Sequence, residues 1–86
     1  MNIVEEEGSF EGVVTYIEPF FYKDDDITYV LADNKGDYII LLKSDDQKLA
    51  VSEGHFVTAY GQVKKTSEKK EDYLMVDRIV IRNVSN

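Results

Sequence analysis

The stretch GHFVTAYGQV, residues 54–63, alternates apolar and polar side chains, and the fold follows from this alternation. A period of two is the pattern of a β-strand with one face toward a core and the other toward solvent. We expect the inward face here to consist of Val57, Ala59, Gly61 and Val63. Gly61 stands where a sharply bent barrel strand comes too close to a neighbouring backbone for a side chain, and Gly12 occupies such a position earlier in the chain.

The same period recurs in four other segments, at residues 10–16, 27–33, 37–43 and 74–81. Pro19 ends the first of them, because proline has no N–H to donate to a sheet ladder. In the last segment the apolar spacing slips by one residue at Asp77-Arg78, which is typical of a β-bulge. From Ser44 to Gly54 the chain is polar and acidic, and we expect a connector with one turn of helix.

Five strands of this kind predict an all-β fold, a five-stranded Greek-key barrel. An open sheet with one apolar face would leave that face and both of its edges unprotected, and closure removes both problems. We expect the strand order one-two-three-five-four-one. The 86 residues suffice for one hydrophobic core only, so we predict a single domain spanning residues 1–86, with its core at about 8–83.

Three motifs carry a resemblance to known proteins: Gly12-Val13-Val14 in the first strand, LADNKG at residues 31–36 in the hairpin, and residues 54–63. In these motifs the chain resembles the OB-fold nucleic-acid-binding families, particularly the anticodon-binding and helicase-associated type, over nearly its whole length. The resemblance implies an OB-fold barrel that acts as a non-catalytic accessory module and binds single-stranded DNA or RNA. Because several OB domains bind only other proteins, a protein-interaction or assembly module stays open as the alternative.

The first candidate binding group is the aromatic run Phe20, Phe21 and Tyr22, in the loop between the first and second strands. OB-fold barrels commonly grip oligonucleotides at their loops, and bases stack on exposed aromatic rings. The alternative is that Phe20 or Phe21 folds back and plugs the end of the barrel.

A second candidate group combines an outward-facing ring, Tyr60, with three cations, Lys43, Arg78 and Arg82. An aromatic platform with cationic flanks is the arrangement that tracks a single nucleic-acid strand. Lys64, Lys65 and the further lysines at residues 69–70 extend this group as a basic rim. The alternatives are an ordinary surface tyrosine and a solvated loop, because acidic residues interrupt the lysines.

The overall charge limits the affinity that we expect for nucleic acid. The chain carries a net charge of −7 at pH 7, whereas non-specific affinity comes mainly from neutralising phosphates with Lys and Arg. We therefore predict modest binding to single strands.

Chemistry-bearing motifs are scarce in this chain. With no cysteine, a single histidine, and neither a nucleophile elbow nor a phosphate-binding glycine loop, we predict that it is not an enzyme and uses no cofactor. The run Asp24, Asp25 and Asp26 lacks the alternating ligand spacing of a calcium loop, so we predict no metal site. The acidic start and the short apolar stretches lead us to expect a cytoplasmic protein with no membrane association.

Ile39 and Leu41 are apolar at positions that the alternation assigns to the outer face, if Tyr38, Ile40 and Leu42 face the core. Apolar residues on both faces of a strand indicate that both faces are covered. The cover is either another part of the chain, namely the connector or the N-terminal segment, or a partner. Ile39 and Leu41 are therefore the candidate partner interface, for self-association or for another protein.

Overall fold

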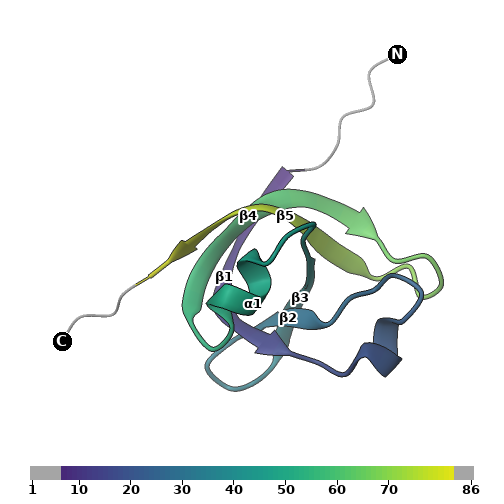
Figure 1. Cartoon of the computed structure of the whole chain (residues 1–86), viewed down its shortest axis with the longest axis horizontal. Coiled ribbons are helices and arrows are strands. Elements are labelled where there is room, and N and C mark those ends of the chain that lie inside the picture. The colour runs from purple at the N-terminus through teal and green to yellow at the C-terminus, as the bar shows by residue number, and fades with distance from the viewer. Residues whose placement is uncertain (1–6, 83–86) are drawn as a thin grey trace, which may run out of the picture.

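Alternating segments of the sequence form five strands in a computed structural model, which describes residues 7–82 (Figure 1). The elements in chain order are β1 (Glu7–Tyr16), the 3-10 helix η1 (Pro19–Tyr22), β2 (Tyr29–Ala32), β3 (Tyr38–Lys43), α1 (Lys48–Ser52), β4 (Phe56–Lys65) and β5 (Asp72–Ile81). The short helix α1 lies in the polar connector between β3 and β4, as predicted.

The strands close into a barrel in the order β1-β2-β3-β5-β4, with β4 returning to β1. All neighbouring strands are antiparallel except β3 and β5, which run parallel over three residue pairs from Leu41↔Tyr73 to Lys43↔Met75. The predicted all-β class, the closure and the strand order are confirmed. This architecture is consistent with an OB-like fold.

Closure depends on two places where backbones approach closely. A Cβ atom added to Gly12 would lie 2.8 Å from the Ala32 carbonyl oxygen, and one added to Gly61 only 2.0 Å from that of Met75. Because a side chain cannot fit at such distances, both glycines serve the purpose that the sequence indicates.

Two irregularities in the ladders decide which residues face the core. On β5, Arg78 pairs with Tyr60 but Val76 pairs with Gly61, so Asp77 is the extra residue of the predicted β-bulge. A second bulge was not predicted: Leu31 pairs with Ile40 and Ala32 pairs with Tyr38, which leaves Ile39 as the extra residue.

The second bulge reverses the side-chain alternation at the start of β3. Ile40 and Leu42 are buried as predicted, but Tyr38 is 64% exposed, so its predicted place in the core is wrong. The reason is that one inserted residue moves every side chain before it to the opposite face of the strand.

Apolar side chains form two clusters on opposite sides of the barrel wall. The barrel interior holds Val14, Leu31, Ile40, Leu42, Leu49, Val57, Ala59, Leu74 and Val76. A second cluster lies on the outer side of β2 and β3 and holds Ile17, Ile27, Val30 and Leu41, with Tyr22 and Tyr73 packed against it.

The second cluster corrects the assignment of Leu41 to a partner interface. Leu41 lies on the outer side, as expected, but it is only 6% exposed because the segment between β1 and β2 covers it. This cover is not the connector, and residues 1–6 of the N-terminal segment lie outside the described part of the chain. Ile39 remains 42% exposed, with its Cδ1 atom close to Gly12, and its role toward a partner stays a prediction.

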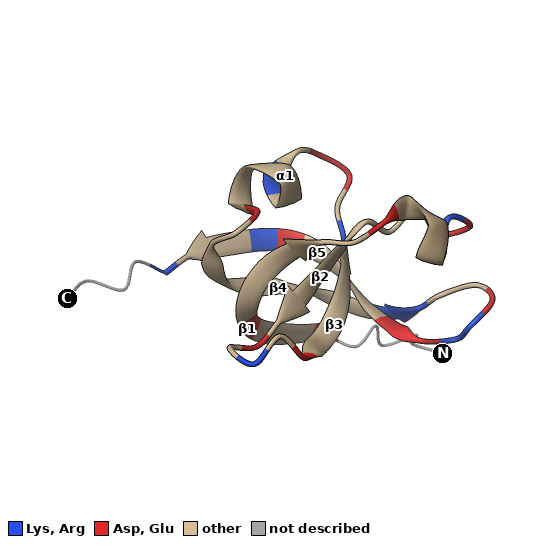
Figure 2. Cartoon of the chain, turned by 90° about the horizontal axis from the view of Figure 1, so that it is seen from below, with Lys and Arg blue, Asp and Glu red and all other residues tan. Residues whose placement is uncertain are grey.

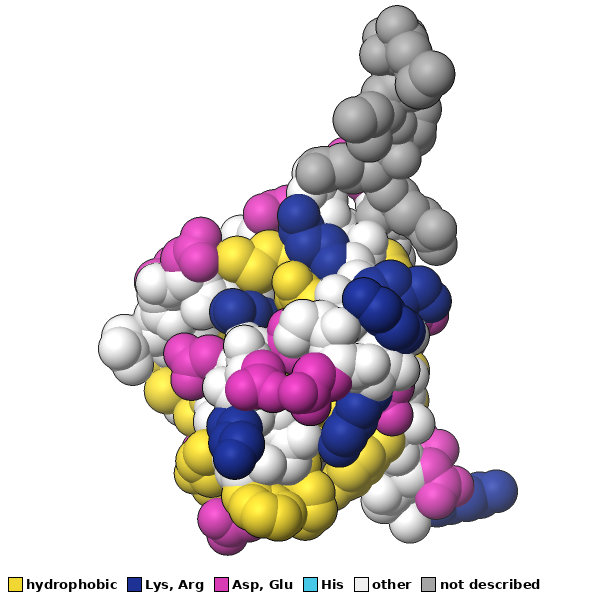
Figure 3. All heavy atoms as spheres, turned by 90° about the vertical axis from the view of Figure 1, so that its right-hand side faces the viewer, with side chains coloured by type: hydrophobic (Ala, Val, Ile, Leu, Met, Phe, Trp, Pro, Cys, Tyr) yellow, Lys and Arg dark blue, Asp and Glu magenta, His cyan; other side chains and the backbone are white. Residues whose placement is uncertain are grey.

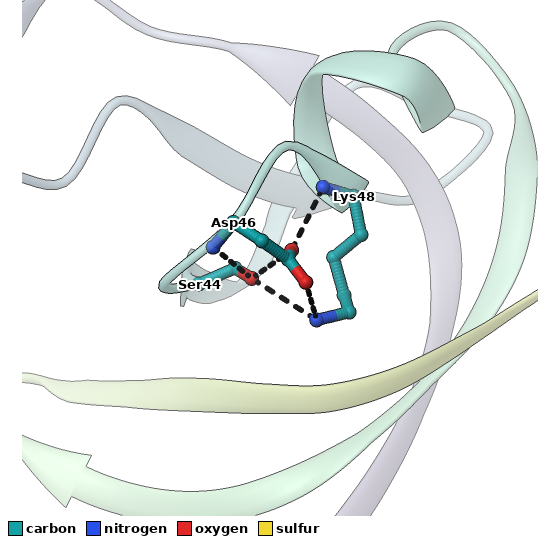
Figure 4. A network of polar contacts seen from close by, with 3 residues as sticks. All are labelled: Ser44, Asp46 and Lys48. Carbon is teal, nitrogen blue, oxygen red and sulfur yellow. Dashed lines mark hydrogen bonds and ion pairs between the residues drawn. The ribbon is translucent and has the colours of Figure 1, made fainter.

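A compact polar network begins helix α1 (Figure 4). The Asp46 carboxylate accepts hydrogen bonds from the Lys48 backbone N–H at 2.9 Å and from the Ser44 hydroxyl at 2.9 Å, and it forms an ion pair with Lys48 Nζ at 2.7 Å. These bonds, led by that of the Lys48 side chain, lower the pKa of Asp46 to about 2. The carboxylate thus holds the first turn of α1, whose Leu49 enters the barrel interior.

Candidate binding surfaces

Two loops far apart in the sequence meet at one end of the barrel. They are residues 17–28, between β1 and β2, and residues 66–71, between β4 and β5, and we call their joint surface the loop face. The Asp25 carboxylate accepts hydrogen bonds from the Ser67 backbone N–H at 3.1 and 3.2 Å and from its hydroxyl at 3.2 Å. Lys69 Nζ donates to the Phe21 carbonyl oxygen at 3.1 Å. The loops are therefore fastened to each other.

Tyr22 is the central side chain of this junction. Its hydroxyl donates to the Glu71 carboxylate, while the Lys69 ammonium group lies 4.5 Å from the centre of its ring. The hydrogen bond to Glu71, followed by burial and by the negative charge of Glu71, raises the pKa of Tyr22 to about 12. Tyr22 thus connects the second apolar cluster to the 66–71 loop.

Phe20 and Phe21 point away from the protein body. They are 76% and 53% exposed, and their rings meet edge to face with centroids 5.4 Å apart. Neither ring plugs the barrel end, and Tyr22 is the aromatic residue of η1 that folds back. The turn begins with Pro19 at its first position, where the missing N–H costs no hydrogen bond.

A hollow of about 300 Å³ lies beside the two phenylalanines, between the loops. Asp24, Asp25 and Glu68 line it together with Lys23 and Lys69. The Asp24 carboxylate, as hydrogen-bond acceptor for the protonated Glu68 carboxyl and through its negative charge, raises the pKa of Glu68. The hollow therefore brings two carboxyl groups into contact next to exposed aromatic rings.

Hydrophobic side chains gather along the lower edge of the side that carries the loop face, with acidic and basic side chains above them (Figure 3). Every loop of the described chain carries at least one acidic residue, and no loop is purely basic (Figure 2). On the side that Figure 3 shows, acidic and basic side chains alternate and do not form a continuous basic surface of the kind that binds phosphates.

The lysines that we predicted to contact nucleic acid are engaged within the protein. Lys43 Nζ donates to the Asp25 carbonyl oxygen at 2.7 Å, and Lys65 forms an ion pair with Asp72 at 2.6 Å. Lys64 is not free of interactions either. Lys43 therefore lies with the loop face, and its expected place beside Tyr60 is not what the structure shows.

Tyr60 and Arg78 come together on the outer face of β4 and β5. They are cross-strand partners, and the Arg78 guanidinium carbon lies 4.4 Å from the centre of the Tyr60 ring. Further along the same face, Arg82 donates to the Thr58 hydroxyl at 3.4 Å, and that hydroxyl donates to the Glu11 carboxylate at 3.3 Å. The predicted group of Tyr60, Arg78 and Arg82 thus shares one face, with an acidic residue on β1 beside it.

No group of three or more His, Cys, Asp or Glu side chains within residues 7–82 is arranged to hold a metal ion. No helix in that part of the chain is long and apolar enough to span a membrane.

Comparison with known proteins gives no match: no family model fits the chain, and neither curated proteins nor solved structures show significant similarity to it. The function therefore rests on the two surfaces themselves, the loop face and the outer face of β4 and β5.

Proposed function

We propose that this chain is a non-catalytic binding module and that the loop face binds a segment of a protein partner. The observation that carries the proposal is the pair Phe20 and Phe21, exposed beside the carboxyl groups of Asp24 and Glu68. Exposed aromatic side chains are typical anchors of protein interfaces, where they fill pockets of the partner.

The charges around the aromatic pair favour a peptide over a phosphate backbone. Carboxylates beside the rings repel phosphates, and of the nearby lysines Lys43 and Lys69 donate to backbone carbonyl groups of the protein itself. A phosphate chain gains affinity only by pairing with cations that it can reach. A peptide with apolar and basic side chains meets no such repulsion.

The interlock of the loops supports the same proposal. Asp25, Ser67 and Tyr22 hold the two loops together before any ligand arrives, so binding does not have to order them. A preorganised surface loses less conformational entropy on binding, which raises the affinity obtained from a given contact area.

Selection from a displayed peptide library, with the full chain as bait, tests this proposal. Peptides that bind the loop face should lose affinity by roughly tenfold or more for the F20S/F21S variant, because anchors of this kind contribute more than about 1 kcal/mol. Val51→Ser is the matched control, since Val51 is an exposed apolar residue on α1. If no selected peptide distinguishes F20S/F21S from V51S, the proposal is wrong.

Single-stranded nucleic acid is the second candidate ligand, and the outer face of β4 and β5 is the surface that favours it. Tyr60 with Arg78 stacked on its ring and Arg82 nearby combines a stacking platform with two cations. Replacing Tyr60 by Ala should weaken binding of an oligonucleotide by about 1–3 kcal/mol with little change in salt dependence.

Arginine variants provide the complementary measurement for this second candidate. Arg82→Gln should flatten the slope of log affinity against log salt by about 0.7 for each phosphate that the variant no longer neutralises. A fluorescent mixed-sequence oligonucleotide, titrated at low salt, serves as the probe. If no binding is detected under these conditions, the nucleic-acid candidate is wrong and the protein-partner proposal is the one that remains.

A further inference from the structure

Strand β1 has one edge without a neighbouring strand in the described chain. It pairs with β4 over residues 7–13, but with β2 only from Val13 to Tyr16. On the side away from β4, residues 7–12 therefore extend past the end of β2. Figure 1 shows this part of β1 at the margin of the barrel.

Two hydrogen bonds at the far end of β1 fix which backbone groups face the unpaired edge. The Val14 N–H donates to the His55 carbonyl oxygen at 3.1 Å, toward β4, and the Ile17 N–H donates to that of Thr28 at 2.8 Å, toward β2. Successive residues of a strand point their backbone N–H and C=O groups to opposite edges. The backbone groups of the even-numbered residues of β1 therefore face β4.

The odd-numbered residues Glu7, Ser9 and Glu11 therefore direct both N–H and C=O away from β4. No strand within residues 7–82 pairs with them on that side. Such a row of backbone donors and acceptors is a template for an added strand.

The side chains of the same three residues give this edge an acidic character. Glu7 and Glu11 are exposed, and Ser9 lies between them. Glu11 accepts a 3.3 Å hydrogen bond from the Thr58 hydroxyl, and that hydroxyl in turn accepts one from Arg82, which follows the end of β5. The edge strand β1 thus carries two glutamates and no basic residue.

This charge distribution selects among possible occupants. Opposite charges on directly paired residues stabilise a sheet, and like charges destabilise it. Antiparallel pairing with β1 of a second copy would bring glutamates close to glutamates, and a phosphate chain would be repelled. A strand with basic side chains opposite Glu7 and Glu11 is favoured.

We propose that the edge of β1 from Glu7 to Glu11 accepts an extended segment of a partner protein that carries two basic residues four positions apart. At about 3.3 Å per residue, that spacing is roughly 13 Å and matches the separation of the two glutamates in either strand direction. The backbone of Ser9 supplies hydrogen bonds in the middle of the added strand. This surface is separate from the loop face, so the inference does not rest on the function proposed above.

A synthetic peptide titrated against the full chain tests the proposal. The probe is a capped peptide of Val and Thr with two lysines four positions apart, and the control peptide has them three apart, on opposite faces of the strand. The expected result is slower hydrogen exchange at the Ser9 and Glu11 amides and little change at Phe10, whose amide already faces β4. Equal protection by the two peptides, or no protection of Ser9 by either, overturns the proposal.

Two variants separate the contribution of the backbone from that of the charges. Ser9→Pro removes a backbone N–H that no other part of the barrel uses as a donor. Because proline is tolerated at edge strands, the variant should fold, and it should no longer bind the lysine peptide. Charge reversal in E7K/E11K should weaken binding of the lysine peptide by about tenfold and should allow a peptide with two glutamates in place of the lysines to bind. Glu53→Lys is the control for a change in net charge. If E7K/E11K still preferred the lysine peptide to the glutamate peptide, the proposal would be contradicted even if S9P did not fold.

The loop-face variant F20S/F21S should bind the lysine peptide as the unmodified chain does. A loss of peptide binding in that variant would place the peptide on the loop face and refute the strand-edge proposal. The two surfaces are therefore tested separately.

Discussion

At Tyr22, one hydroxyl group links the second apolar cluster to the loop after β4. The neighbouring phenylalanines are exposed, but the Tyr22 ring packs inward and its hydroxyl donates to Glu71. Burial of the ring and bonding of the hydroxyl explain why this residue, among three consecutive aromatics, faces the protein.

The raised pKa of Tyr22 predicts how the loop junction responds to alkali. Because the folded state favours the protonated phenol, its contribution to stability is fully present below pH 10 and is lost as the pH rises toward about 12. Tyr22→Phe should remove the tyrosine that titrates in this window, as measured by ultraviolet absorbance against pH. It should also flatten the pH dependence of stability there, and an unchanged dependence would show that Tyr22 does not hold the loops.

At the scale of elements, the outer face of β3 at Leu41 is covered by the chain's own segment from Ile17 to Thr28 and not by a partner. Leu41 packs against Ile17, Ile27 and Val30, whereas Ile39 is partly exposed. Leu41→Ala should therefore cost about 2–5 kcal/mol of stability, the usual range for a buried leucine. Ile39→Ala should cost clearly less, and urea denaturation of the two variants provides the comparison. Similar losses for both would contradict the internal cover.

The start of α1 gives a second prediction at this scale, now toward acid. The pKa of Asp46 is lowered from 3.8 to about 2, so its contribution to stability is present above pH 4 and is lost as the pH falls toward 2. Asp46→Asn should reproduce this loss at neutral pH and increase amide exchange in Lys48–Ser52. Ser44 and Lys48 would keep each other as partners in the variant, so the effect should stay local to α1. Slow exchange in α1 of D46N would show that the carboxylate does not hold the turn.

For the whole molecule, the sequence predicts the barrel well because its signals are local. The alternation in 54–63 and 74–81, the slip at Asp77 and the small residues at close approaches all act within one strand or between neighbours. The bulge at Ile39 was missed because the segment DYIILLK is apolar on both faces, so its alternation carries no information about which face is which.

The candidate surfaces were less predictable than the barrel, for a physical reason. The contacts that decide them join residues more than 40 positions apart, such as Asp25 with Ser67 and Lys69 with Phe21. Whether a lysine faces solvent or a backbone carbonyl depends on how two loops meet, and no local pattern encodes that. Tyr60 and Arg78 share one face as predicted, because they are cross-strand partners and the bulge beside them, at Asp77, is visible as the slip in apolar spacing.

The short parallel contact between β3 and β5 has a consequence for the kinetics of folding. It spans three residue pairs, and the other closing contact, between β1 and β4, joins opposite halves of the chain. Both closing contacts join segments that are far apart in the sequence. The chain therefore loses conformational entropy on closing these loops before the contacts that offset this loss have formed. We expect folding in the millisecond to second range typical of small β-barrels, with Leu42→Ala at the seam speeding unfolding more than it slows folding, as measured by stopped-flow fluorescence of the tyrosines. A larger effect on the folding rate would mean that the seam forms in the transition state, and that the barrel closes early rather than last.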